Sequence, residues 1–400
     1  MDSIYLDHNA TTPLLPEVAG AIHQCLRARY GNPASQHAAG RRARQALEDA
    51  REAIARMLGA DLASHHADRL IFTSGGTEAN NLAVLGLATG RPAHAVVSAI
   101  EHPSVAAPAH CLEQRGWRVD RLPCNAHGVV CAEELPALLR PDTRLVSVML
   151  GNNETGVLQP VLRLAEICNA AGVPLHTDAV QVVGKLKVDF RGLGAAAMSA
   201  SAHKFHGPVG VGVLLVRRGV ELEPQMAGGF QQQGLRPGTE PVALAVGMQR
   251  ALECCHGDWP ESSERVQALR DRFESMLLDE CPRLVVNGAG ADRLPHTSNV
   301  AFPGVDGQAL LMALDLAGVA CSYGSACASG SPEPSPALVA MGLPQALLQA
   351  SLRFSLGRGT TAPELAEAAR RITKIYKDLQ TRAQPRKMAG TARKEGVDSV

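Results

Sequence analysis

The sequence has no apolar run long enough to span a bilayer and no excess of charge of either sign. Its 400 residues include 39 basic and 39 acidic side chains. Because nucleic acids and anionic membrane surfaces select a basic excess, neither is expected as the main partner. The first residues, MDSIYLDHNATTP, also lack the basic and apolar segments of a secretory leader. We therefore expect a soluble, cytoplasmic protein.

Metal-binding cysteine spacing is missing as well. The chain has ten cysteines but no C-x-x-C pair, and Cys254 and Cys255 are merely adjacent. In a large chain without a leader, such cysteines are expected to be reduced thiols, and zinc sites usually require paired spacing. No metal site is predicted.

Short apolar runs alternate with longer segments of helical period. This alternation is typical of βαβ units, so we predict an α/β fold with a mostly parallel sheet covered by helices. The strands are expected at 69–73, 94–98, 145–149, 173–177, 195–199 and 212–216, with helices among them at 104–115 and 159–171.

The length exceeds that of a usual single domain, and the pattern breaks in polar and turn-forming residues at 255–260. A long helix is expected at 261–280. We predict a large domain over 1–257, whose N-terminal segment 1–14 packs on a smaller α+β domain at 258–382. The polar residues 383–400 are expected to form a disordered tail.

A glycine-rich segment, FTSGGTEAN at 72–80, follows the first expected strand and opens a helix. Glycines allow close backbone approach, and a helix N-terminus presents free N–H groups to an anion. Gly76 and Thr77 are therefore candidate phosphate ligands. Taken alone, the segment fits an ordinary strand–helix turn better.

Two charged residues follow neighbouring expected strands. Lys204, in SASAHKFHGP, lies in a sharply fixed turn, where a neutral amine can form a Schiff base. A surface lysine is the ordinary alternative. Asp178 ends the preceding strand and could keep a pyridinium nitrogen protonated, and Gln181 could reach a phenolic oxygen on the same ring. Together these residues match the requirements of pyridoxal 5′-phosphate (PLP).

Three more side chains follow strands or lie in one. His102, in EHPS, can stack on a ring or move a proton, although a lone histidine is more often structural. Asn153, in NNETG, could orient a substrate carboxylate. Arg353, in LRFS, could bind that carboxylate bidentately, and a structural ion pair is an equal alternative.

Cys327 lies in a segment of small residues and prolines, YGSACASGSPEPS at 323–335. The segment has no apolar period, so a mobile, exposed loop is expected. An exposed thiol on such a loop is suited to a nucleophile that must move.

These motifs resemble, in order, those of the NifS/IscS-like cysteine desulfurases, which belong to the class V aminotransferases within fold-type I PLP enzymes. The resemblance extends from residue 5 to about residue 358. Its markers are ATTP at 10–13, GNP at 31–33, the 73–81 run, NNE at 152–154, Asp178 with Gln181, SAHK at 201–204, GSAC at 324–327 and 352–358.

The resemblance implies an aspartate-aminotransferase-like fold with a seven-stranded sheet. It implies that Lys204 holds PLP and moves the substrate Cα proton, and that His102 stacks on the ring while Asp178 and Gln181 bind its nitrogen and phenolic oxygen. The other implied roles are phosphate binding by Gly76, Thr77, Ser201 and His203, and substrate binding by Asn153 and Arg353.

The implied reaction converts L-cysteine into L-alanine and leaves a persulfide on Cys327. The sulfur would pass to an acceptor such as an iron–sulfur scaffold or a tRNA-thiolation protein. Thr239 matches a position that reaches the partner subunit's phosphate in a homodimer. The chain departs from the family at Gln232, Gln233 and Pro237, close to that position.

Other functions remain open at this point. A selenocysteine lyase would share the fold and the site, whereas a class V transaminase has no need of Cys327. A non-catalytic sulfur-transfer scaffold would have no reason to keep Lys204, Asp178, His102, Cys327 and Arg353 together. A metalloenzyme based on His203 and His206 lacks a ligand set.

Overall fold

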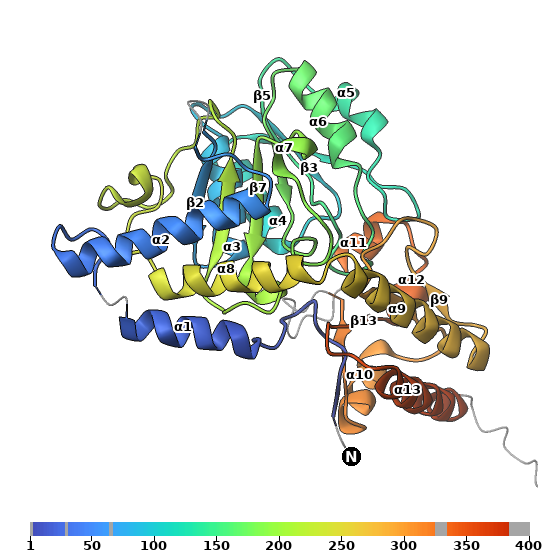
Figure 1. Cartoon of the computed structure of the whole chain (residues 1–400). Helices are drawn as coiled ribbons and strands as arrows, with labels where there is room; N and C mark the ends of the chain where they lie inside the picture. The colour runs from blue at the N-terminus through green and yellow to red at the C-terminus, as the bar shows by residue number, and fades with distance from the viewer. Residues whose placement is uncertain (1–2, 29–30, 64–66, 325–333, 384–400) are drawn as a thin grey trace, which may run out of the picture.

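A computed structural model (Figure 1) describes residues 3–28, 31–63, 67–324 and 334–383. The predicted reactive residue Cys327 and the predicted tail from 384 onward lie outside these residues. Among the described residues, none of the helices combines the length and the apolar character needed to cross a membrane.

A seven-stranded sheet forms the centre of the larger part, in the order β2-β8-β7-β6-β5-β3-β4. The pairs from β7 to β4 are all parallel, and β8 runs antiparallel to both of its neighbours. The mostly parallel seven-stranded sheet is thereby confirmed. Its strands are β2 (Arg69–Thr73), β3 (His94–Ser98), β4 (Arg118–Leu122), β5 (Thr143–Ser147), β6 (Leu175–Asp178), β7 (Ala197–Ser201) and β8 (Gly212–Val216).

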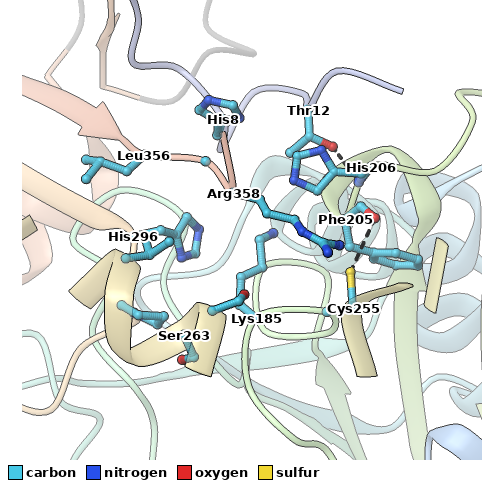
Figure 2. Close-up of a pocket in the computed structure, with 15 residues that line it drawn as sticks. His8, Thr12, Lys185, Phe205, His206, Cys255, Ser263, His296, Leu356 and Arg358 are labelled. Atoms are coloured by element: carbon cyan, nitrogen blue, oxygen red, sulfur yellow. Dashed lines mark hydrogen bonds between the residues drawn. The ribbon is translucent and has the colours of Figure 1, made fainter. Parts of the chain in front are cut away.

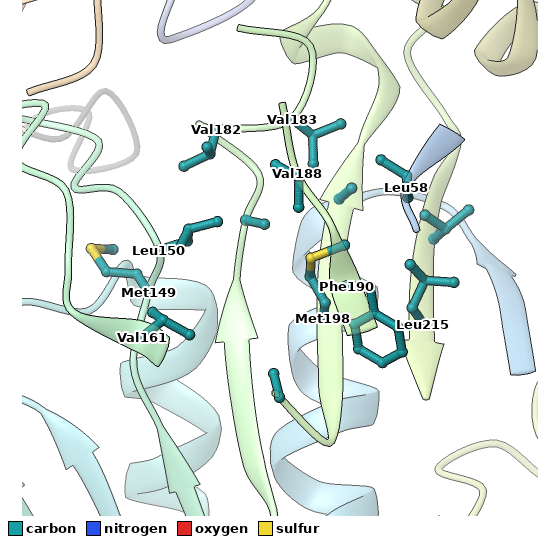
Figure 3. Packing of buried hydrophobic residues seen from close by; sticks show 14 of the residues in the cluster. Leu58, Met149, Leu150, Val161, Val182, Val183, Val188, Phe190, Met198 and Leu215 are labelled. Atoms are coloured by element: carbon teal, nitrogen blue, oxygen red, sulfur yellow. The ribbon is translucent and has the colours of Figure 1, made fainter. Parts of the chain in front are cut away.

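Helices cover both faces of this sheet, which explains why every residue of β6, β7 and β8 is buried. Alternate residues of each strand face opposite layers. One layer contains α2 (Ala38–Met57), α6 (Val161–Ala170), α7 (Phe190–Leu193) and α8 (Val242–Gly257), with α1 (Pro16–Ala28) against α8; the other contains α3 (Gly76–Leu87) and α4 (Pro103–Gln114). In Figure 3, Phe190 and Met198 pack beside Leu215 in the first layer.

A second core forms around a four-stranded antiparallel sheet with the order β12-β13-β10-β9. Helices α9 and α13 pack together against it, with α10 alongside (Figure 1). Its elements are α9 (Glu261–Glu280), β9 (Val285–Val286), β10 (Thr297–Ala301), α10 (Gly307–Leu316), β11 (Val319–Ala320), β12 (Ser322–Tyr323), β13 (Ser351–Ser355) and α13 (Ala362–Ala383). Helices α11 (Pro336–Ala340) and α12 (Gln345–Leu348) form a small separate apolar cluster, and α5 (Leu135–Leu138) belongs to the larger part.

The N-terminal segment joins the two cores. Strand β1 (Ile4–Tyr5) pairs in parallel with β11, and Ile4 and Leu6 are buried in the second core. The chain then crosses to the large sheet, where the Thr12 N–H donates to the His203 carbonyl at 2.9 Å. The N-terminal segment thus contacts residues of both cores.

The side chain of Gln232 lies along the outermost strand, β2. Its Oε1 accepts from the Phe72 N–H at 2.7 Å, and its Nε2 donates to the Phe72 carbonyl at 2.8 Å. Gln232 and Gln233 both adopt left-handed backbone, with φ of 50° and 62°. The departure from the family pattern at 232 therefore serves the sheet, since the amide completes the pairing of an edge residue.

His176 is buried in β6 with a serine hydroxyl on each side. Its Nδ1 lies 2.9 Å from Ser147 Oγ, and its Nε2 lies 2.9 Å from Ser199 Oγ. Burial lowers the pKa of His176 to about 3. The imidazole therefore stays neutral in the folded protein across the range in which an unfolded histidine, with a pKa of about 6.5, takes up a proton.

We expect His176→Asn to lower the free energy of unfolding by about 2–4 kcal/mol, because buried serine hydroxyls lose a partner. The unfolded state binds the extra proton below about pH 6.5, so the wild type loses stability as pH falls, by about 1.4 kcal/mol per pH unit from this group. The substitution removes that share. Urea unfolding at pH 5, 6 and 7 measures both effects. Ser147→Ala is the control, which should lower stability without changing the pH slope.

Candidate active site

A cavity of about 270 Å³ opens at the carboxyl ends of the parallel strands. Parallel strands present these ends at one edge of a sheet, where ligands of α/β proteins gather. Most of the site residues predicted from sequence line this cavity: Gly76, Thr77, His102, Asn153, Asp178, Gln181, Ser201, His203 and Lys204.

Asp178 ends β6 and is 6% exposed. Its Oδ2 accepts from Asn80 Nδ2 at 2.6 Å, and its Oδ1 accepts from the Val180 N–H at 2.9 Å. Asn80 also donates to Ser104 Oγ at 2.8 Å. Two neutral donors thus fix the carboxylate without neutralising its charge, which leaves it suited to binding a cationic N–H group.

His102 caps the N-terminus of α4. Its Nδ1 accepts from the Ser104 N–H at 3.1 Å and lies 2.7 Å from Ser104 Oγ. Because Nδ1 is an acceptor, a neutral ring carries its proton on Nε2. Burial lowers the pKa of His102, with Asp178 opposing the shift and Lys204 adding to it. A neutral, fixed imidazole can stack on a flat ring in the cavity.

Lys204 ends the short 3₁₀ turn η2 (Ala202–Lys204), which directly follows β7. Its Nζ donates to the carbonyl oxygens of Asn9 and Ala10, at 2.6 and 2.8 Å. The N-terminal segment therefore holds the amine in the cavity and leaves it near the groups on β6. The ordinary alternative, an exposed surface lysine, does not apply.

Donors for an anion gather where β2 meets α3. Gly76 begins α3, and a Cβ atom at this position would lie 2.8 Å from Val180 Cγ2. The Ser201 hydroxyl is buried at 1% exposure and has no hydrogen-bond partner among the described residues. Thr77 and His203 line the same region. The helix N-terminus and an uncommitted hydroxyl together suit a phosphate.

The amide of Gln181 is partly committed. Its Nε2 donates to the Asn9 carbonyl at 3.1 Å, and its Oε1 has no partner among the described residues. The second N–H of the amide is available to an oxygen in the cavity.

Arg353 lies on β13, is 1% exposed and is not among the residues that line the cavity. It pairs with Asp7 at 2.7 Å and donates to the Asn153 carbonyl at 3.0 Å. The structural ion pair considered from the sequence is therefore present. Arg353 Nε has no partner among the described residues, so the guanidinium keeps donor capacity for a carboxylate.

Thr239 is exposed and does not line the cavity of its own chain. Gln231 Oε1 accepts from the neighbouring Gly238 N–H at 3.2 Å. The structure therefore does not bring Thr239 together with the other predicted residues within one chain.

The sequence did not single out the residues that hold the site. Asn80, Ser104, Asn9 and Asp7 each orient a predicted residue through the hydrogen bonds described above. Glu101 is also buried beside His102 and accepts from the Met149 N–H at 2.8 Å, and burial raises its pKa to about 8. A polar residue inside an apolar helix face, such as Asn80, is the signal that was available for this group.

The cavity fits the PLP that the sequence resemblance implies. The fixed Asp178 carboxylate suits a pyridinium N–H, and Gln181 suits a phenolic oxygen. The uncommitted Ser201 hydroxyl and the N-terminus of α3 suit a phosphate, and Lys204 lies within the same lining.

Known proteins match almost the whole chain. The family model of class V aminotransferases matches residues 4–367. The cysteine desulfurase IscS of Dictyoglomus turgidum is 41% identical, covering 94% of this chain and 95% of its own. The cysteine desulfurase NifS of Azotobacter vinelandii is 38% identical, covering 95% and 94%.

Solved structures agree in fold. A NifS-like protein superposes with a TM-score of 0.86 at 34% identity, covering 94% of this chain and 100% of its own. A NifS-like protein from Rickettsia africae gives 0.85 at 29% identity, covering 94% and 99%. These likenesses confirm the fold class predicted from the sequence.

We expect Asn80→Ala to weaken PLP binding by about tenfold or more, because Asp178 loses the donor that orients it, and 1.4 kcal/mol corresponds to a factor of ten. Equilibrium dialysis of PLP into cofactor-stripped protein measures the effect without turnover. Asn81→Ala is the matched control, since Asn81 lies on the same helix, does not line the cavity, and donates to the Thr77 carbonyl. Equal loss in both variants would contradict the role of Asn80.

Proposed function

The chain belongs to the cysteine desulfurases of the class V aminotransferase family, and we propose that it removes sulfur from L-cysteine, releases L-alanine and carries the sulfur on Cys327. The observation that carries this proposal is the convergence of Lys204, Asp178, His102 and Gln181 on one cavity beside an N-terminal helix end.

PLP, when bound, supplies an electron sink for the electrons left on a substrate Cα after proton loss. We assign its attachment to Lys204, its ring nitrogen to Asp178 and its phosphate to Gly76, Thr77, Ser201 and His203. His102 would stack on its ring. The donors on Asp178 support this assignment, because both are neutral and leave the carboxyl group without a charged partner.

Lys204 is suited to moving the substrate proton. Its amine is held by two carbonyl oxygens in the same cavity as Asn153, one of the residues assigned to the substrate. Arg353, fixed by Asp7, would hold the substrate carboxylate through its remaining donors. These contacts would hold the substrate Cα beside the Lys204 amine.

The sulfur step is assigned to Cys327, as its thiolate. Attack on the substrate sulfur forms an S–S bond as the Cβ–S bond breaks, and the electron pair of the broken bond stays with the carbon skeleton. Protonation of that skeleton gives alanine. An ordinary thiol has a pKa of about 8.5, so a cationic neighbour would be needed to favour the thiolate.

Two further parts of the proposal concern partners. The protein would act as a homodimer in which Thr239, exposed on its own chain, reaches the partner's phosphate site. The persulfide would pass to a sulfur-acceptor protein, either an iron–sulfur scaffold or a tRNA-thiolation protein. The cytoplasmic location stays a prediction.

We expect the PLP-loaded protein to release alanine and sulfide in equal amounts over many turnovers when it receives L-cysteine and a reductant. Lys204→Ala should form neither alanine nor sulfide, and borohydride reduction should attach no PLP to it. Lys187→Ala should form both products and should retain PLP after reduction. Quantifying alanine and sulfide in one sample decides the reaction. PLP binding without alanine would refute the desulfurase activity on cysteine, and selenocysteine would then be tested.

We expect Cys327→Ala to bind PLP and to show the same change in the cofactor spectrum on adding cysteine. Alanine release should fall by about a hundredfold or more, because the nucleophile for the sulfur is lost. Rapid-quench measurement of alanine gives the rate. Release at the wild-type rate would rule out Cys327 as the sulfur carrier, and Cys131→Ala serves as the thiol control.

A further inference from the structure

A second cavity, of about 50 Å³, lies where the loops of the large sheet meet the second core. Figure 2 shows side chains around it from the N-terminal segment, the loops after β6 and β7, helices α8 and α9, and the segments flanking β10 and β13. The residues that matter here are His8, Lys185, His206, Cys255, His296 and Arg358.

The lining is basic. It contains three histidines, a lysine and an arginine, and no aspartate or glutamate is present among the described lining residues. Arg358 pairs with Asp258, which does not line the cavity. The cavity therefore has an excess of nitrogen donors and no internal counter-charge.

His296 has the strongest unmet demand for a ligand. It is 2% exposed, and neither ring nitrogen has a hydrogen-bond partner among the described residues. His8, at 6% exposure, likewise has no partner for its Nδ1 there. Buried polar atoms without partners are costly, so these nitrogens favour a bound group that forms hydrogen bonds with them.

Burial and the neighbouring positive charges disfavour protonation of the bases in the lining, a cost that a bound anion would offset. Burial, followed by the positive charge of Lys204, lowers the pKa of Lys185 to about 7. Burial, followed by His206, lowers the pKa of His8 to about 4. Burial also lowers the pKa of His206 and, well below its usual range, that of His296. Each base would hold its proton more readily beside a negative charge.

We propose that this cavity binds one small inorganic anion, held by Lys185 and His296. About 10–15 Å³ of such space accommodates one water molecule, so the cavity has room for a few waters or a single small ion and none for an amino acid. A metal ion does not fit, since no group of three His, Cys, Asp or Glu residues in the described part of the chain could hold one.

Residues that line this cavity also contact the backbone of residues that line the candidate active site. Lys185 Nζ donates to the Lys204 carbonyl at 2.5 Å, and Thr12 Oγ1 donates to the His203 carbonyl at 2.9 Å. The ion would thus contact both cores and the N-terminal segment. Because it would bind the folded state and not the unfolded state, it would raise the free energy of unfolding.

Binding should strengthen as pH falls, because an anion favours the protonated lining. The titratable and charged groups that face the site are His8, Lys185, His206, Cys255, His296 and Arg358, with Lys204 and His203 behind them. Burial raises the pKa of Cys255 to about 11, so its thiol stays neutral and does not repel the ion.

Crystals of the cofactor-loaded protein soaked in sodium bromide at pH 6 test the site directly. We expect an anomalous peak at the bromine edge within hydrogen-bond distance of Lys185 Nζ and a His296 ring nitrogen. Water alone in the cavity, at a bromide concentration that labels the protein surface, would overturn the proposal. This readout uses the unaltered chain and is independent of turnover.

Thermal unfolding provides the test in solution. Bromide is compared at equal ionic strength with benzenesulfonate, an anion too large for this cavity, and the difference in melting temperature between the two salts is measured. At pH 6 the melting temperature in bromide minus that in the reference salt should be higher for the wild type than for His296→Leu, by about 2 °C or more. At pH 8 the two proteins should differ less in this quantity. His110→Leu, on the exposed side of α4, should behave as the wild type. Equal differences in wild type and His296→Leu would contradict the site.

Discussion

The buried guanidinium of Arg353 is the group around which the two cores and the N-terminal segment are organised. A buried charge is tolerated only when it is paired and hydrogen-bonded, and removing one partner of such a pair typically costs about 3–5 kcal/mol. Arg353 obtains its partners from Asp7 and from the Asn153 carbonyl, which belong to different parts of the chain. Once Asp7 is fixed there, Asn9 and Ala10 must pass over Lys204, and their carbonyls orient its amine.

Much of the fold followed from hydrophobic patterning. Strands expected at 69–73, 94–98 and 212–216 and the helix at 261–280 have those bounds in the structure. Strand β5 was expected two residues late, because the apolar run continues through Met149 and Leu150 after the strand has ended. Strand β4 was missed because it lies at the sheet edge and carries arginine and aspartate, so its sequence lacks a buried apolar run.

The site was predictable where chemistry requires a particular residue at a strand end, as with Asp178 and Lys204. It was not predictable where a residue acts by holding another. The contact from Asn80 to Asp178 spans 98 positions and depends on how α3 crosses the sheet, which no local pattern specifies. The sequence left the carboxylate-clamp and ion-pair interpretations of Arg353 equally open; the structure contains the ion pair with Asp7, and the clamp stays a prediction.

The amide of Gln232 has a consequence for the behaviour of the protein in a crowded solution. The outermost strand of a sheet presents unpaired peptide groups, which are a template for strand-by-strand association between molecules. Gln232 presents a donor and an acceptor to Phe72 as a neighbouring strand would, with its own backbone turned into the left-handed region. The peptide groups of Phe72 are thereby withheld from pairing with a strand of another molecule.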